Sequence, residues 1–189
     1  VFIVCCLPFL LGFLVPFLFI LHNVVQTFFQ INYDNLLQLT WNTVYVASLS
    51  SIIIIFVALF FLFVERISKA KISFYINNLI SLGYALPGAI IGLGLILVFS
   101  YYSLIGSFFV LVFAYLIRFL AVGKSPIKSS IEKHPESIDD TGKNLGLGPF
   151  KLLQRIHLPI NKFALISAFI VTFIDVMKEL PITLILRPF

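Results

Sequence analysis

Long apolar runs separated by polar segments set the pattern of this chain. Each run is long enough to cross a bilayer as a helix, and together they cover residues 1–21, 41–64, 80–101, 104–120 and 159–180. The runs are continuous rather than alternating, which favours helices over the strands of a membrane barrel. We therefore expect an all-α fold, a polytopic transmembrane helical bundle with about five spans.

Composition supports a membrane protein and excludes other classes. Of the 189 residues, 60% are hydrophobic and 11% are charged, whereas soluble domains carry about 25% charged residues. The net charge of +5 does not indicate a nucleic-acid partner, because the basic residues flank apolar runs and form no patch with interleaved aromatic residues. Cys5 and Cys6 are adjacent within the first run, which favours simple packing over a disulfide or a metal site.

The ends of the sequence indicate part of a longer polypeptide. The chain begins at Val1 inside an apolar run and ends at Phe189 without a polar tail. The first run has neither a basic leading segment nor a small-residue cleavage site, so we expect a span there rather than a signal peptide. Residues 1–189 are therefore interpreted as one transmembrane domain that is incomplete at both ends.

The distribution of Lys and Arg predicts the orientation of the spans. Three basic residues follow the second run, and Arg118 together with the polar stretch 124–162 adds eight more of the thirteen in the chain. The linker 22–40 has none. Because basic residues favour the cytoplasmic side, 65–71 and 124–162 are expected inside the cell and 22–40 outside. Arg118 is expected to extend to the lipid headgroups.

The polar stretch 124–162 has the features of two short helices joined by a turn. Pro135 suits the first turn of a helix over 135–145, acidic residues follow it, and Gly146 is placed to end it. A second helix, from Pro149, places three apolar residues on one face: Phe150, Leu153 and Ile156. That face suits the groove of a partner protein; the alternative is a loop that lies on the headgroups.

The same stretch resembles the EAA loop of binding-protein-dependent ABC transporter permeases. Asp140-Thr141-Gly142 supplies an acid and two small residues, Gly146 follows six positions after the acid, and Ile156-His157-Leu158-Pro159 begins ten positions later. This spacing fits the family pattern without a gap. The departures are Asp in place of Glu and Thr141-Gly142 in place of two alanines, and glycine inside a helix costs about 1 kcal/mol relative to alanine.

Two further stretches are similar to the ferric-iron-type branch of these permeases. They are LGYALPG at residues 82–88 and KELPITLILRP at residues 178–188. The resemblance covers about half of the chain clearly and the rest more weakly. It implies the fold of type I importer permeases, in which two six-span halves commonly share one polypeptide. Residues 1–189 would then be most of a second half, and 124–162 would be its cytoplasmic coupling loop.

The resemblance implies a transport subunit rather than an enzyme. Cytoplasmic ATP-binding subunits would hydrolyse ATP, a periplasmic substrate-binding protein would deliver ferric iron, and a second permease half, fused or separate, would complete the pathway in the bacterial inner membrane. No cofactor or catalytic residue is implied, and the sequence has no GxxxxGK[ST] phosphate loop. The expected coupling residues are Asp140, Thr141, Gly142, Gly146, Ile156, Leu158 and Pro159.

The resemblance also suggests a role for each part of the loop. Asp140 would contact a basic residue of the ATPase, and Gly146 would allow the bend between the helices. Ile156 and Leu158 would anchor the second helix, and Pro159 would begin the last span.

Three charged residues lie near the end of the last apolar run. Asp175, Lys178 and Glu179 are three and four positions apart, so they can share one helix face. A charge at the bilayer centre costs about 2.5–3.5 kcal/mol, and such residues are commonly functional. We expect a substrate pathway or gate, with a self-neutralising interfacial cluster as the alternative. A dedicated metal site is not expected, because two carboxylates beside a lysine hold a cation poorly.

Other functions stay open on the sequence alone. Related permeases carry thiamine, sulfate, phosphonates or polyamines, and the loop pattern does not separate them. A secondary transporter or channel would have charges inside its spans, and the first four apolar runs nearly lack them. A non-functional remnant is a third alternative. An adjacent ATPase and binding protein in the genome would favour the importer.

Overall fold

A computed structural model of the chain describes residues 2–28, 32–68, 71–101 and 106–187. Every regular element within these ranges is a helix, which confirms the all-α prediction. The chain divides into two compact units, Val1–Asn42 and Thr43–Phe189.

The first unit is helical through most of the predicted linker 22–40. It contains α1 (Phe2–Phe9), a π-helical turn η1 (Leu10–Leu14), α2 (Val15–Thr27) and the beginning of α3 (Tyr33–Ser68). The predicted polar linker is therefore mostly helix, and a polar side chain within it bonds back to the helix itself. Thr27 Oγ1 donates to the carbonyl oxygen of Asn23 at 2.8 Å, one helical turn earlier.

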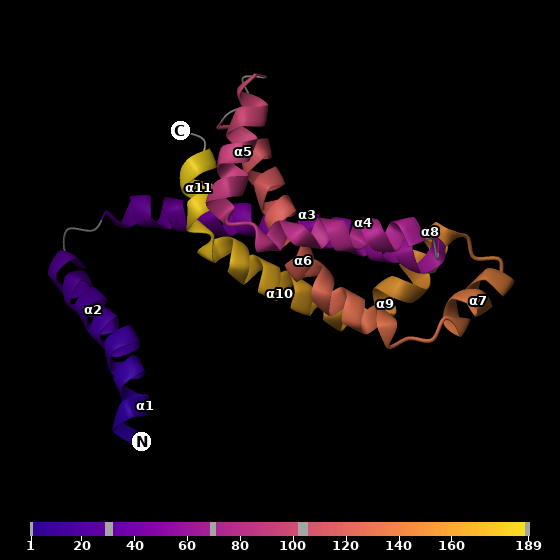
Figure 1. Cartoon of the computed structure of the whole chain (residues 1–189), viewed down its shortest axis with the longest axis horizontal. Helices are drawn as coiled ribbons and strands as arrows, with labels where there is room; N and C mark the ends of the chain where they lie inside the picture. The colour runs from indigo at the N-terminus through magenta and orange to yellow at the C-terminus, as the bar shows by residue number, and fades with distance from the viewer. Residues whose placement is uncertain (1, 29–31, 69–70, 102–105, 188–189) are drawn as a thin grey trace. The chain divides into compact units, whose positions relative to one another are not determined.

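The second unit is organised around one long helix, α6 (Phe108–Glu132). Helix α10 packs along α6, and α5 and α11 also pack against it (Figure 1). After α3, the elements of this unit are α4 (Lys71–Ser81), η3 (Leu82–Ala85), α5 (Gly88–Ser100), α6, α7 (Ser137–Asn144), α8 (Pro149–Leu152), the π-helical turn η4 (Leu153–His157), α9 (Leu158–Ile160), α10 (Lys162–Lys178) and α11 (Leu180–Leu186).

The described helices provide three to five membrane spans. Three are long and apolar enough to cross alone, namely Cys6–Thr27, Tyr33–Ser68 and Phe108–Glu132. Two more spans result if each bent pair counts as one: Lys71–Ala85 with Gly88–Ser100, bent by 107°, and Pro149–Ile160 with Lys162–Lys178, bent by 76°. The chain is therefore a multi-pass helical membrane protein, as predicted, with two of its expected spans broken.

The third predicted span, 80–101, is interrupted at Leu86–Pro87. Leu86 has an extended backbone with ψ 134°, and Pro87 follows with ψ 136°. Proline lacks an N–H group and disfavours a helical conformation in the residue before it. The proline therefore ends η3, and α5 begins afresh at Gly88 in a new direction.

The fourth predicted span, 104–120, is longer than expected, and its first residues and the turn before it lie outside the described part. Helix α6 continues through Glu132, so the start of the polar stretch 124–162 is helix rather than loop. Lys124 is only 6% exposed, and its Nζ donates to the backbone oxygen of Asn77 and to Oγ of Ser81, both at 2.6 Å. These bonds satisfy the ammonium group and let the helix continue past it.

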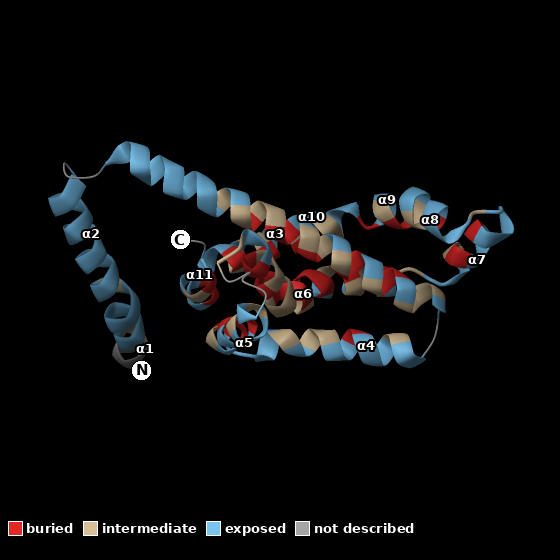
Figure 2. Cartoon of the chain, turned by 90° about the horizontal axis from the view of Figure 1, so that it is seen from above, coloured by how far each residue is buried: buried red, intermediate tan, exposed pale blue. Residues whose placement is uncertain are grey.

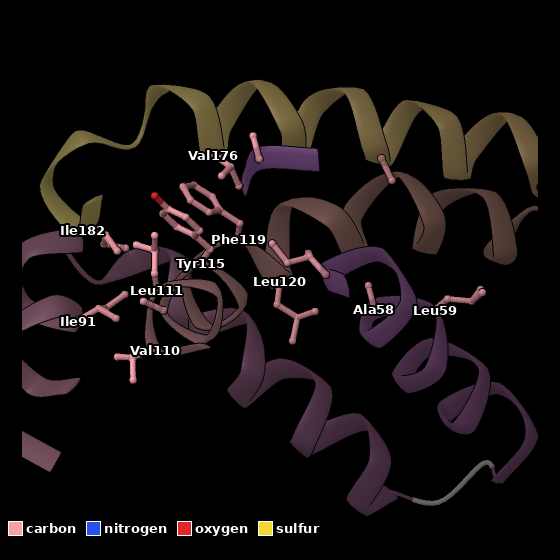
Figure 3. Close-up of a cluster of buried hydrophobic side chains, with 14 of the residues drawn as sticks. Ala58, Leu59, Ile91, Val110, Leu111, Tyr115, Phe119, Leu120, Val176 and Ile182 are labelled. Carbon is pink, nitrogen blue, oxygen red and sulfur yellow. The ribbon is translucent and has the colours of Figure 1, made fainter. Parts of the chain in front are cut away.

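Apolar side chains from α3, α5, α6, α10 and α11 form one core in the second unit. Figure 2 shows the buried positions as stripes along α3 and α6, and Figure 3 shows Leu111 and Phe119 of α6 in the same cluster as Val176 and Ile182. The glycine pair Gly88 and Gly92 faces α11: a Cβ at Gly92 would lie 3.1 Å from Ile185. The pair therefore lets a neighbouring helix approach closely.

Candidate functional site

The turn between α7 and α8 has the hydrogen bonds of a Schellman motif. The N–H of Gly146 donates to the carbonyl of Lys143 at 2.9 Å, and the N–H of Leu147 donates to the carbonyl of Gly142 at 3.0 Å. Gly146 has φ +77°, which is strained for residues with a Cβ. The structure confirms that Gly146 follows the end of the first helix in a glycine turn, and its role in coupling stays a prediction.

Gly142, where the sequence departs from the family pattern, is buried beneath the second helix. A Cβ at this position would lie 2.4 Å from Cδ1 of Leu152 and 3.1 Å from Cδ1 of Ile156. Leu152 is fully buried. The glycine therefore permits a close approach of α8 and η4 to α7, which offsets its poor helix propensity. Ile156 contributes to this packing, as expected of an anchor.

A buried ionic network ties α7 to two other helices. Nε of Arg66, near the end of α3, lies 2.5 Å from Oδ2 of Asp139 in α7. The other carboxylate oxygen, Oδ1, lies 2.6 Å from Nε2 of His157 in η4. The three side chains are 4 to 9% exposed. Because both carboxylate oxygens are bonded to buried partners, the network fixes α7 between α3 and η4.

Arg66 also binds the carboxyl end of α6. Its Nη1 donates to the carbonyl of Ile131 at 2.6 Å, and its Nη2 donates to the carbonyls of His134 and Pro135, both at 3.1 Å. Ile131 lies in the last turn of α6, and a guanidinium at a helix C-terminus favours the helix dipole. One side chain therefore connects the ends of α3, α6 and α7.

The pKa of the Asp139 carboxyl reflects two opposing effects. Burial alone would raise it, but the hydrogen bonds from Arg66 and His157, together with their charges, lower it below its ordinary value. Asp139 is therefore a carboxylate at neutral pH, and the network depends on its charge.

His157 connects this network to the last long helix. Its ring packs edge-on against Phe63, with the centroids 5.4 Å apart, and its carbonyl accepts a 2.8 Å hydrogen bond from Nδ2 of Asn161. Asn161 is buried, and the chain bends there before α10 begins at Lys162. The prediction that Pro159 begins the last span was wrong: Pro159 lies in α9, before the bend.

The π-helical turn before Pro159 has a simple cause. A proline cannot donate to the carbonyl four residues earlier and its ring clashes with it. The wider turn of η4, over Leu153–His157, accommodates the ring without ending the helix. Leu158 packs against the core of the second unit, in agreement with its expected anchoring role.

The remaining predicted coupling residues are at the surface. Asp140 is exposed, and its Oδ1 lies 3.5 Å from Nζ of Lys143. Thr141 Oγ1 donates to the carbonyl of Ser137 at 2.8 Å. The expected apolar face of the second helix is divided: Phe150 is 69% exposed, but Leu153 and Ile156 are half-buried within the protein. Only part of that face is available to a partner, because the rest packs internally.

The charged trio near the end of α10 does not act as one cluster. Glu179 is buried, and its Oε2 lies 3.0 Å from Nε of Arg118 in the middle of α6. Arg118 Nη1 also donates to the carbonyl of Leu86 at 2.6 Å. The prediction that Arg118 extends to the headgroups was wrong, because the breaks at Leu86 and Glu179 bring a carbonyl and a carboxylate to it.

The other two members of the trio lie apart from Glu179. Asp175 Oδ1 is 3.9 Å from Nζ of Lys178, whose side chain is 71% exposed. Oε1 of Glu179 instead accepts the N–H of Ile182 at the start of α11. The shared helix face was not realised because α10 ends at Lys178 and the backbone turns at Glu179.

The described part of the chain holds no group of three or more His, Cys, Asp or Glu side chains that could bind a metal ion.

Sequence reasoning missed Arg66, Asp139 and His157 as a group. Asp139 precedes the motif acid, and His157 occupies the variable position between Ile156 and Leu158. The sequence offered two signals. One was the polar His157 between the apolar residues Ile156 and Leu158, and the other was Arg66 at the end of the second apolar run. No spacing rule joins residues so far apart in the chain.

Comparison with known proteins gives a relative that matches most of this chain. No protein-family model matches the chain. The chain is similar to the Fe(3+)-transport system permease protein FbpB 2 of Haemophilus influenzae, with 28% identity over 147 residues. The matched region covers 77% of this chain and 29% of that protein, so the chain spans less than a third of its relative. This similarity agrees with the resemblance seen in the motifs, because the chain is similar to a permease protein of an Fe(3+)-transport system.

Proposed function

We propose that the chain is part of the membrane permease of an ATP-driven importer that moves ferric iron from the periplasm to the cytoplasm. Cytoplasmic ATP-binding subunits would supply the energy, and a periplasmic substrate-binding protein would deliver the ion. A second permease half, fused or separate, would complete the pathway in the bacterial inner membrane. The similarity to an Fe(3+)-transport permease supports the choice of substrate.

The observation that carries the coupling role is the attachment of α7–η4 to the spans. The Arg66–Asp139–His157 network joins this polar element to α3 and, through Asn161, to the start of α10. A push on the exposed surface of α7 or α8 would therefore move the ends of two long helices rather than a loose loop. Rigid connection between a partner's surface and a helix end is what alternating access requires.

The exposed part of the element offers a surface to the ATPase. Leu145 and Phe150 are 77% and 69% exposed on either side of the glycine turn, and Asp140 lies exposed on α7. Apolar side chains of this size at a surface commonly mark a protein interface. Asp140 would pair with a basic residue of the ATPase, and the two apolar side chains would enter its groove.

The test is iron uptake by the permease reconstituted in proteoliposomes with its ATP-binding and substrate-binding partners. We expect ATP-dependent uptake of radioactive ferric iron, and no comparable uptake of thiamine, sulfate, phosphonate or polyamine. A bulky residue at Gly146 should reduce the iron taken up per ATP hydrolysed, because its φ of +77° costs a residue with a Cβ about 1–2 kcal/mol.

Gly148 provides the matched control within the same turn. Its φ is −67° and a Cβ there would meet no atom within 4 Å, so Gly148→Leu should leave uptake close to that of the wild type. Equal uptake by Gly146→Leu and Gly148→Leu would contradict the coupling role. Preferred uptake of another solute by the wild type would contradict ferric iron as the substrate.

A further inference from the structure

A groove on the second unit brings together oxygen-bearing side chains from three elements. It has a volume of about 410 Å³, and its polar lining consists of Tyr84 from η3, Ser125 from α6 and Asp175 from α10. The other lining side chains are apolar, among them Val122 and Val171. The three polar residues are far apart in sequence and meet only because the chain breaks after η3 and α10 packs along α6.

The polar groups of this groove are those that a hard cation prefers. A carboxylate, a phenol and a hydroxyl all present oxygen, which hard metal ions favour over nitrogen or sulfur. Six water molecules at about 30 Å³ each occupy about 180 Å³, so a cation that keeps most of its hydration fits the space. Apolar walls around a few oxygen ligands are typical of sites that hold a small ligand in a fixed place.

Asp175 is free to accept a cation in a way that Glu179 is not. Both oxygens of Glu179 are engaged, by Arg118 and by the N–H of Ile182. Within the part of the chain that the structure describes, the ion pair of Asp175 is with Lys178: its Oδ1 lies 3.9 Å from Nζ of a lysine side chain that is 71% exposed. An ion pair so long and so exposed is weak, so the lysine can move away when a stronger cation arrives.

We propose that this groove holds the substrate cation transiently during its passage, with the Asp175 carboxylate and the Tyr84 and Ser125 oxygens as ligands, directly or through water. The inference rests on the proposed function in taking a ferric ion as the cargo. A single carboxylate gives weak binding, which suits a pathway because an ion that binds too tightly cannot leave.

Terbium(III) is a suitable probe, because it is a hard trivalent cation without redox chemistry and its luminescence is sensitised by a nearby tyrosine ring. The purified permease in detergent would be titrated with terbium chloride, and emission would be excited through tyrosine. We expect saturable emission that lanthanum(III) competes away. Asp175→Asn should raise the terbium concentration at half-maximal emission by about tenfold, because it removes the one charged ligand. Tyr84→Phe should remove most of the emission.

Two variants serve as matched controls for these changes. Tyr75 of α4 is 70% exposed and lies outside the groove lining, so Tyr75→Phe should keep the emission. Asp175→Glu keeps the carboxylate and should retain binding, which separates ligand loss from misfolding. The proposal is overturned if Asp175→Asn and Tyr84→Phe titrate like the wild type, or if Tyr75→Phe lowers emission as much as Tyr84→Phe does.

Further measurements separate this inference from the proposed function. Competition by spermidine but not by lanthanum would show that the groove takes an organic cation, and would overturn a metal site. Iron uptake by Asp175→Asn equal to that of the wild type would show that the groove lies off the pathway. Terbium binding at the groove with no iron uptake by the wild type would contradict the proposed function, while the cation site itself would stand.

Discussion

The second unit contains two buried arginine–carboxylate pairs that differ in their surroundings. Arg66 bonds to the Asp139 carboxylate and to three backbone carbonyls, and His157 binds the second carboxylate oxygen. Arg118 meets the Glu179 carboxylate and one carbonyl, and its side chain is 20% exposed. The first pair joins the end of α3 to the polar stretch 124–162, and the second joins the middle of the apolar helix α6 to Glu179 after α10.

The two arginines stabilise the ends and interruptions of helices in different ways. Arg66 bonds to carbonyls at the end of α6 and just after it, and its pairing with Asp139 fixes α7 beside them. Arg118 joins two breaks that are distant in sequence, the one at Leu86–Pro87 and the one at Glu179. Removing one partner of a buried pair leaves an uncompensated charge, and the cost rises with the number of bonds lost. We therefore expect the first region to be the more sensitive to substitution.

The largest effect is expected for Arg66→Ala. It removes four bonds, including the one that pairs the buried Asp139 carboxylate, and we expect a loss of about 3–5 kcal/mol in the free energy of unfolding. Thermal unfolding of the purified protein in detergent would measure this loss. Arg155→Ala, at an exposed position of η4, is the control and should change little. If Arg66→Ala lost no more stability than Arg155→Ala, the greater sensitivity of the Arg66–Asp139 pair would be contradicted.

A smaller but substantial effect is expected for Gly83→Ala, which tests how closely η3 approaches α6. A Cβ there would lie 2.1 Å from the backbone oxygen of Ile117. Backbone atoms cannot rotate aside, so we expect a loss of about 3 kcal/mol, at the upper end of overpacking costs. Gly94→Ala meets no atom within 4 Å and should be neutral or stabilising. Equal thermal unfolding of the two variants would contradict the close approach.

Arg118→Ala should cost less than Arg66→Ala, about 1–3 kcal/mol, because fewer bonds are lost and the side chain is less buried. A double variant, Arg118→Met with Glu179→Leu, should recover part of the loss because it leaves no unpaired charge. A double-mutant cycle of unfolding free energies measures the coupling. Additive losses from the two sites would show that the pair contributes no coupling of its own.

The smallest effect is the pH dependence of the Asp139 network. The pKa of Asp139 is lowered in the folded protein, so its charge stabilises the fold above its ordinary value of 3.8, and this contribution is lost as the pH falls below that value. The stability difference between wild type and Asp139→Asn should therefore be constant near neutral pH and narrow below about pH 3.8. A difference that narrows already between pH 7 and pH 5 would contradict the lowered pKa.

The comparison also shows what a sequence reveals about such a molecule. Periodicity and length located the apolar helices, and glycine spacing located the turn at Gly146, because both are local properties. Arg118 was misplaced because its partners come from breaks at Leu86 and Glu179, which only the packed chain brings together. Gly142 departs from the motif in sequence, and its reason is a tertiary contact: the side chain of Leu152 packs directly against it.

The broken spans illustrate the same limit. A proline in an apolar run can be tolerated within a membrane helix, as Pro8 is in α1, or can end the helix, as at Pro87. The outcome depends on whether neighbouring groups satisfy the freed carbonyls. At Leu86 the guanidinium of Arg118 does so, and this contact could not be inferred from the run itself.

The central claim is that the Asp139 network transmits the movement of the ATPase to the spans. Its most direct test is the iron taken up per ATP hydrolysed by Asp139→Asn in proteoliposomes with the partner subunits. We expect ATP hydrolysis to continue while uptake per ATP falls by about tenfold, since the side chain keeps its shape but loses its charge. Asp34→Asn, in the other unit, should match the wild type. An unchanged ratio of uptake to hydrolysis in Asp139→Asn would contradict the claim.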